Sequence, residues 1–236
     1  MAAILGLRTA SIACPDSTTC ADKFSHPPTS SGAVGAMPGL EIAAQLMPLN
    51  RRFIDWLRLV NVLPEITARR LAELEPAACD RVAQCPFTLF SLEMDTPLRW
   101  RPLIDTARRE SGSIVHDAQH AERDAVASAA LCLTWHLAQG HVTCARAVMG
   151  VHVAVAEALR ALPIANLPVL AALASPLLRP RWPDSVHFWG DLLRDAATPA
   201  VPELTRTYLY GRQRIAAESM GLIPRRRSRA SRRMVY

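Results

Sequence analysis

Two histidines near the middle of the chain have the spacing of a metal-binding helix. His116 and His120 lie one helical turn apart with Asp117 between them, which matches the zincin pattern His-Glu-x-x-His except that Asp replaces Glu. Asp124 follows one turn later, but a helix rises about 1.5 Å per residue, so Asp124 would lie ~12 Å from His116. His116 and Asp124 therefore cannot bind the same ion, because metal–ligand bonds are only ~2 Å long. His116 and His120 are therefore metal candidates without a third ligand, and we expect a solvated helix face that holds neither metal nor cofactor.

The cysteines do not supply the missing ligands. No two of them have the Cys-x-x-Cys spacing of a zinc site. The chain also lacks a Gly-rich phosphate loop, a Gly-x-Ser-x-Gly elbow and a Cys/His pair with an orienting acid, so we expect no enzyme activity. The first residues show no secretory signal, and we expect a cytoplasmic protein with reduced thiols. The six cysteines are Cys14, Cys20, Cys79, Cys85, Cys132 and Cys144.

Arginines near the end of the chain are the remaining chemical signal. The net charge of the chain is +6, and without these six arginines it holds 21 basic and 21 acidic residues. Guanidinium groups bind phosphate, so the pattern predicts a nucleic-acid-binding arm that adds affinity but little sequence choice. The alternative is a solubilising terminus. The six residues are Arg225, Arg226, Arg227, Arg229, Arg232 and Arg233.

The composition predicts an all-α protein. Half of the 236 residues are hydrophobic, and aromatic residues make up only 6%. Ala and Leu dominate, while strand-forming residues seldom alternate. We expect a multi-helix orthogonal bundle with a disordered N-terminus and a basic C-terminal tail. The expected parts are a disordered segment (1–38), an N-terminal helical part (39–110), a second helical domain (111–222) and the Arg-rich tail (223–236).

Apolar spacing locates the helices that must position these groups. One expected helix covers 49–62, with Leu49 and Phe53 on its apolar face and Asn50 opposite them. Another covers about 114–139 and ends at Gly140 as a left-handed cap residue. Residues 125–145 and 161–178 contain no Asp, Glu, Lys or Arg, and we interpret both as buried core helices rather than membrane spans. Further helices are expected at about 97–109, 142–150, 152–162, 164–174 and 201–219, and one more is expected to begin at Pro183.

Short helices with strong apolar stripes occupy 142–174. Gly150 lies between two of them, where a sharp turn can require a positive φ. Helices this short are unstable alone and must pack on neighbours, so we expect a compact module, and a second copy of the chain is one way to complete it. The predicted dimer or core residues are Leu137, Gly150, Val155, Leu159, Leu162, Leu167 and Leu170.

The segment from 136 to 182 carries a more specific pattern. Its residues are Leu137-Ala138-Gln139, Gly150-Val151, Ala156, Leu159, Ala161-Leu162, Leu170-Ala171 and Arg181 followed by the aromatic Trp182. This pattern resembles FlhD, a subunit of the bacterial flagellar master transcription activator, over about 45 residues. The resemblance implies an all-helical, dimer-forming regulator subunit that contacts DNA partly through a partner subunit.

The sequence departs from FlhD in three respects. The helix between Gln139 and Gly150 is about one turn shorter than in the family, and Leu178 stands where a family cysteine can link two subunits. The first 110 residues have no counterpart in FlhD. Two other functions stay open: a helical protein–protein adaptor without DNA binding, contacting its partner through the 49–62 helix or the region of Trp135, and a hydrolase-type metal enzyme at His116 and His120.

Overall fold

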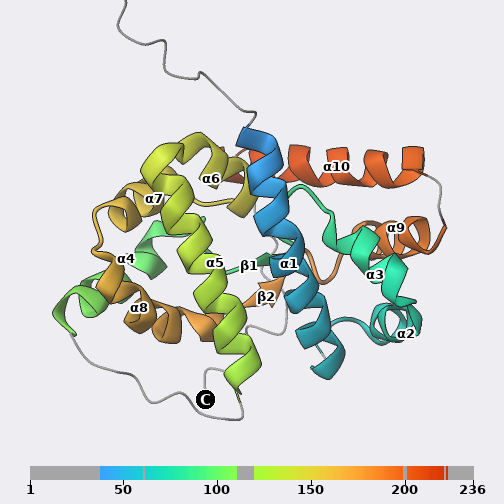
Figure 1. Cartoon of the computed structure of the whole chain (residues 1–236), viewed down its shortest axis with the longest axis horizontal. Coiled ribbons are helices and arrows are strands. Elements are labelled where there is room, and N and C mark those ends of the chain that lie inside the picture. Colours follow the sequence, from blue (N-terminus) through green and yellow to red (C-terminus); the bar gives the residue numbers. More distant parts are fainter. Residues whose placement is uncertain (1–37, 61, 111–119, 199–200, 221, 223–236) are drawn as a thin grey trace, which may run out of the picture. The chain divides into compact units, whose positions relative to one another are not determined.

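The computed structural model describes residues 38–60, 62–110, 120–198, 201–220 and 222. These residues form an all-α fold, as predicted (Figure 1). The disorder expected for 1–38 and the basic tail expected for 223–236 lie outside the described residues, except for Pro38, which begins a helix. The helices are α1 (Pro38–Leu59), α2 (Glu65–Glu73), α3 (Pro76–Ala83), α4 (Pro97–Arg109), α5 (Ala121–Gly140), α6 (Val142–Met149), α7 (Val153–Arg160), α8 (Leu167–Ala174), α9 (Val186–Ala197) and α10 (Val201–Ser219).

Two kinds of short element complete the described fold. Two strands, β1 (Phe90–Ser91) and β2 (Arg179–Pro180), pair antiparallel. Short 3-10 turns, η2 (Ile164–Asn166) and η3 (Ser175–Leu177), flank α8. The β1–β2 pair joins two segments far apart in the sequence and lies behind α5 and α1 in Figure 1.

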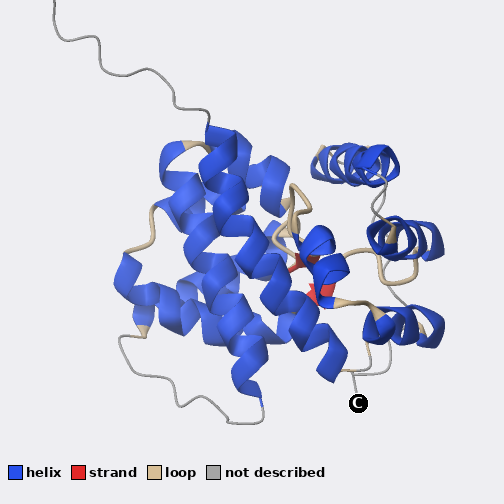
Figure 2. Ribbon diagram, turned by 45° about the vertical axis from the view of Figure 1, so that its right-hand side comes forward, coloured by secondary structure: helices blue, strands red, loops and turns tan. Residues whose placement is uncertain are grey.

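Helix α5 is the centre of the fold. It packs against α1, α6, α7 and α8. α7 and the segment Ile164–Leu177 meet at 112°, close to the orthogonal arrangement that we predicted. Along the other side of the molecule α2, α9 and α10 follow one another (Figure 2), and α9 contacts both of its neighbours.

Helices from both halves of the sequence share one core. The described residues form one compact unit. α1 packs against α3 and α5, α4 packs against α7 and α8, and α3 packs against α9. The expected boundary near 110–113 therefore does not separate an N-terminal part (39–110) from a second domain (111–222), because neither set of apolar stripes is covered without the other.

Two helix boundaries differ from the prediction for local reasons. α1 begins at Pro38 rather than near Leu49, because Pro48 does not end it. Pro48 is exposed, and the apolar stripe continues on its N-terminal side through the buried Leu46. Gly140 belongs to α5 and has no positive φ, so its prediction as a left-handed cap is wrong. His141, with φ −146°, makes the turn before α6 instead.

Asn50 is buried, although we expected it opposite the apolar face of its helix. Its side chain is 0% exposed. The amide Nδ2 donates to the carbonyls of Ala83, Cys85 and Phe87 at 3.2, 3.2 and 3.0 Å, and Oδ1 accepts the Leu89 N–H at 3.0 Å. One amide thus satisfies the irregular backbone that leads from α3 to β1, which is why a polar residue is placed in the core.

Both charge-free stretches lie in this core. Residues 125–145 form most of α5 and the start of α6, and 161–178 form α8 with its flanking turns. Within the described residues no individual helix has the length and apolar composition to cross a bilayer. The segments Val153–Arg160 and Ile164–Leu177 meet that criterion only jointly, across their sharp bend.

Candidate nucleic-acid interface

Gly150 and Arg181, two residues of the FlhD-like pattern, meet in the interior. Gly150 ends α6 with φ +65°, as the sequence suggested. A Cβ atom on Gly150 would lie 3.0 Å from both Nη1 and Nη2 of Arg181. The position therefore needs glycine for its backbone conformation and for the close approach of the arginine side chain.

The Arg181 guanidinium group joins three segments of the chain. Arg181 is 3% exposed. Its Nε donates to the Thr88 carbonyl at 2.7 Å, and its Nη2 donates to Thr88 Oγ1 at 3.0 Å and to the Met149 carbonyl at 2.5 Å. These bonds tie the segment before β1 and the end of α6 to β2. Arg181 therefore serves the fold and is not accessible to a phosphate group.

Trp182 connects this buried centre to α10. Its ring packs edge-on against Phe188, with ring centroids 4.7 Å apart. The indole Nε1 donates to Glu218 at 2.7 Å, and the Arg214 guanidinium group lies 4.6 Å from the ring centroid. Arg214 also pairs with Glu218 at 3.2 Å. The last turns of α10 are thus in direct contact with Trp182, at the end of the 136–182 segment.

The inner face of α10 is fitted closely to the body of the protein. Gly211 is required there, because a Cβ would lie 2.2 Å from Cζ of Phe87. Thr207 donates to the buried Asp195 at 3.0 Å, and the Tyr208 hydroxyl donates to the backbone carbonyl of Arg81. Burial raises the pKa of Tyr208, so its hydroxyl stays protonated and remains a donor at neutral pH. These contacts determine which side of α10 faces outward.

The outer face of α10 is basic and polar. Arg206, Tyr210 and Gln213 are exposed at i, i+4 and i+7, so they lie on one side of the helix over about 10 Å. Leu209 and Arg212 are exposed beside them. Neither Arg206 nor Arg212 forms an ion pair with a described residue. Two guanidinium groups are therefore available to a ligand on this face.

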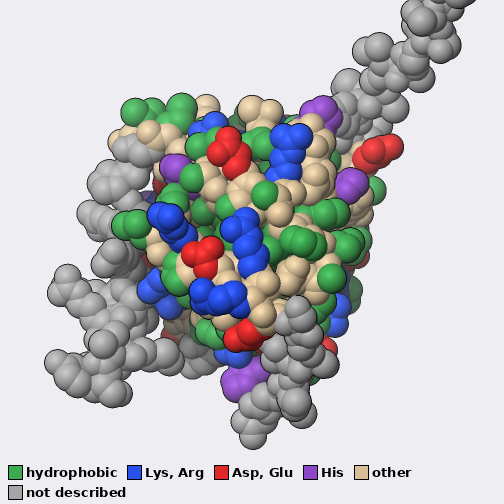
Figure 3. Space-filling model, turned by 90° about the vertical axis from the view of Figure 1, so that its left-hand side faces the viewer, with side chains coloured by type: hydrophobic (Ala, Val, Ile, Leu, Met, Phe, Trp, Pro, Cys, Tyr) green, Lys and Arg blue, Asp and Glu red, His purple; other side chains and the backbone are tan. Residues whose placement is uncertain are grey.

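The charge of the chain is concentrated at this end. Residues 201–236 contain nine arginines and two glutamates, whereas residues 1–200 contain 18 basic and 19 acidic residues. On the opposite side of the molecule, over α4 and α7, Arg side chains alternate with Asp and Glu (Figure 3). Two arginines of α4 have acidic partners: Arg99 pairs with Glu93, and Arg108 lies 3.8 Å from Asp105. The surface of α10 and the sequence after it is therefore the strongest anion-binding candidate.

The other predicted site residues fall into two groups. The six arginines Arg225 to Arg233 lie outside the described residues. The predicted dimer or core residues are all buried within one chain, so their burial requires no second subunit. They are Leu137, Gly150, Val155, Leu159, Leu162, Leu167 and Leu170.

No metal centre is assembled in the part of the chain that the structure describes. His116 lies outside it, and His120 is exposed at the N-cap of α5, where its side chain makes no capping hydrogen bond. The described residues contain no group of three or more His, Cys, Asp or Glu side chains that could hold an ion. Cys85 is buried, which raises the pKa of its thiol and keeps it in the unreactive neutral form.

Three important residues were missed from the sequence. Asn50 was placed on the wrong face, and Thr88 carries no sequence signal for its contact with Arg181. Gly211 did carry one, because a glycine inside a helical pattern often marks a close packing contact. It would have shown which face of the last helix is turned inward.

The geometry provides an exposed helix, continuous in sequence with an Arg-rich segment, on which Arg206 and Arg212 form no ion pair with a described residue. Such an arrangement can bind a polyanion and can place hydrogen-bonding side chains at a fixed depth. A comparison of the chain with family models, with curated proteins and with solved structures gives no match. The function therefore has to be inferred from this surface and its surroundings.

Proposed function

We propose that this protein is a DNA-binding regulator of transcription, or a subunit of one, that contacts duplex DNA through α10 and the arginines that follow it. The observation that carries the proposal is the charge distribution: nine arginines against two glutamates in residues 201–236, in a chain that is otherwise balanced. Such a segment releases the counterions of a nucleic acid on binding, which supplies affinity. In this proposal the protein acts on DNA in the cytoplasm, and its role requires neither catalysis nor a cofactor.

The shape of α10 suits the major groove. The groove is about 12 Å wide and admits one α-helix. Arg206 and Gln213 are of the types that read guanine and adenine, and both lie on the outer face. Arg212, at the side of that face, is placed to contact a phosphate. In this proposal Arg225 to Arg233 then bind the backbone beyond the helix, which adds affinity without sequence choice.

The resemblance to FlhD supports the same function from a different part of the chain. It implies a transcriptional activator subunit that works as a dimer and with a partner subunit. The pattern residue Trp182 is bonded to Glu218 of α10. The FlhD-like segment and the basic surface are therefore in direct contact, as expected of a regulator subunit with a fixed DNA-binding helix.

Binding to a labelled duplex, followed by fluorescence anisotropy across a series of salt concentrations, tests the proposal. The double substitution R206A/R212A should weaken binding at least tenfold and reduce the salt slope by about one to two. Deletion of residues 224–236 should reduce the slope by up to about five, since six phosphate contacts are at stake. R101A/R160A is the matched control, because Arg101 and Arg160 are also exposed and form no ion pair with a described residue.

Two results would contradict the proposal. The first is a full-length protein that binds no duplex at low salt. The second is a pair of variants, R206A/R212A and the tail deletion, that bind with the affinity and salt slope of the wild type. Either result would favour the adaptor function, with the exposed face of α10 as a surface for protein instead of DNA.

A further inference from the structure

The central helix α5 has one stripe that stays largely exposed among the described residues. Glu122, Ala129 and His136 are exposed along it, and the intervening positions fall on the same side of the helix. The spacing alternates between three and four residues, which is the heptad spacing of a helix–helix seam. We call this stripe the α5 seam. Its residues are Glu122, Ala125, Ala129, Cys132, His136 and Gln139.

The composition of the α5 seam is that of a packing surface. An exposed helix face normally carries charged side chains, but residues 125–145 contain no Asp, Glu, Lys or Arg. Ala125, Ala129 and Cys132 are small, so a second helix could approach closely at the middle of the seam. Because α5 is apolar on its covered sides as well, it has the character of a buried helix along its whole length.

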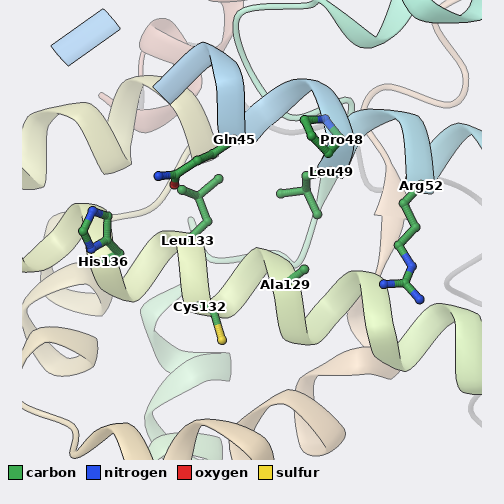
Figure 4. A pocket seen from close by; sticks show the side chains of 8 residues that line it. All are labelled: Gln45, Pro48, Leu49, Arg52, Ala129, Cys132, Leu133 and His136. Carbon is green, nitrogen blue, oxygen red and sulfur yellow. The ribbon is translucent and has the colours of Figure 1, made fainter. Parts of the chain in front are cut away.

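A groove between α1 and α5 adjoins the seam. It has a volume of about 470 Å³. Leu49 and Leu133 lie between the two helices, whereas Cys132 points away from α1 (Figure 4). The partner helix would therefore meet apolar side chains on both α5 and α1. The lining residues are Gln45, Pro48, Leu49, Arg52, Ala129, Cys132, Leu133 and His136.

The two ends of the α5 seam are electrically different. At the N-terminal end Glu122 lies 3.5 Å from Arg52 of α1. At the other end are His136, Gln139 and the C-terminal carbonyls of α5, which form the negative end of the helix dipole. An antiparallel second copy would place Glu122 against His136 and Gln139, and Arg52 near those carbonyls. A parallel copy would place each charge against itself.

We propose that two copies of this chain associate through the α5 seam, with their α5 helices antiparallel and a two-fold axis between Ala129 and Cys132. In this register Ala129 faces Cys132 of the other copy, and Glu122 faces Gln139. α5 and α1 together offer a strip of about 30 by 20 Å, or ~600 Å². This lies in the range of ~600–1,000 Å² per partner that specific complexes bury. The inference does not depend on DNA binding by α10.

The molar mass of the full-length protein in solution, measured by light scattering, tests the surface. The wild type should be a dimer at micromolar concentration, and Ala129→Arg should be a monomer because a long charged side chain cannot be accommodated at the axis. Ala72→Arg is the control, since Ala72 is exposed on α2, away from the seam. It should remain a dimer. A monomeric wild type, or a dimeric Ala129→Arg variant with native helicity, would overturn the proposal.

Substitutions of Gln139 test the antiparallel direction. Gln139→Arg should tighten the dimer several-fold, because each arginine then faces Glu122 of the other copy, and Gln139→Glu should weaken it by a similar factor. Gln139 also donates to the Arg160 carbonyl at 2.9 Å, so Gln139→Leu, which removes this bond without adding a charge, is the control for both variants. In a parallel dimer both would weaken association, since like charges would face each other. Equal effects of the two variants would therefore exclude the proposed register, whatever the DNA-binding assay shows.

Discussion

Arg181 and Arg206 show how differently one residue type is used in two regions of this molecule. Arg181 is 3% exposed, and its guanidinium group donates hydrogen bonds to the carbonyls of Thr88 and Met149 inside the protein. Arg206 is exposed on α10 and pairs with no described carboxylate. The first arginine holds segments together, and the second is available to something outside the chain. Loss of the first should affect stability, and loss of the second should affect binding.

The two regions are nevertheless connected. Trp182, next to Arg181 in sequence, bonds to Glu218, which also holds Arg214 of α10. The buried centre therefore supports the helix that carries the exposed charge. Substitutions in the two regions should therefore separate stability from binding, and their expected effects on the free energy of unfolding differ by up to tenfold.

The largest effect is expected for Arg181→Met. The substitution leaves the carbonyls of Thr88 and Met149 buried without their donor, which should lower the free energy of unfolding by about 3–5 kcal/mol. Urea denaturation followed by circular dichroism measures this loss. Arg101→Met, at an exposed position, should change stability by less than about 0.5 kcal/mol. Equal stabilities of the two variants would show that the Arg181 bonds do not hold the fold.

Asn50→Leu should have the next largest effect. Leucine has a similar volume but no amide, so the carbonyls of Ala83, Cys85 and Phe87 and the N–H of Leu89 lose their partner in the core. We expect a loss of about 2–4 kcal/mol in the free energy of unfolding, measured in the same urea titration. A variant as stable as the wild type would mean that water replaces the amide at this position.

The sequence was sufficient to predict where most helices lie, but it did not predict which polar residues are buried in the core. Apolar spacing located α4, α6, α8 and α10 to within a few residues, because each buries one face. However, an argument from periodicity assigns each residue to a helix face by its polarity. It therefore predicted wrongly that Asn50 faces solvent. The same argument predicted that residues 39–110 form a separate part, because local spacing contains no information on contacts between helices that are distant in the sequence.

The candidate site was predictable in part for a similar reason. The Arg-rich end is visible in composition, but Arg206 and Arg212 are ordinary helix residues until the inward contacts of Gly211 and Tyr208 fix the rotation of α10. In the same way Gly150 was predicted as a turn residue, but its contact with Arg181 was not. The contact joins the residue after α6 to the residue after β2, and no rule of local sequence connects them.

Two glycine substitutions should change the free energy of unfolding in opposite directions. Gly150→Ala places a Cβ at φ +65° and 3.0 Å from the Arg181 guanidinium group, so we expect a loss of about 1–3 kcal/mol. Gly140→Ala adds a Cβ with no atom within 4 Å at the end of α5, and it should raise stability by about 0.4–1 kcal/mol. Thermal or urea unfolding of both variants checks the sign. Destabilisation by Gly140→Ala would mean that the end of α5 requires a conformation only glycine adopts.

The smallest effect on stability is expected for Arg206→Ala, and it is the result that separates the two regions. Arg206 makes no ion pair with a described residue, and alanine favours a helix slightly more than arginine, so the free energy of unfolding should change by less than about 0.5 kcal/mol. The same protein should bind duplex DNA more weakly than the wild type in fluorescence anisotropy. If Arg206→Ala instead lowered stability as Gly150→Ala does, the outer face of α10 would be part of the fold, because a residue that only meets a ligand has nothing to contribute before the ligand binds.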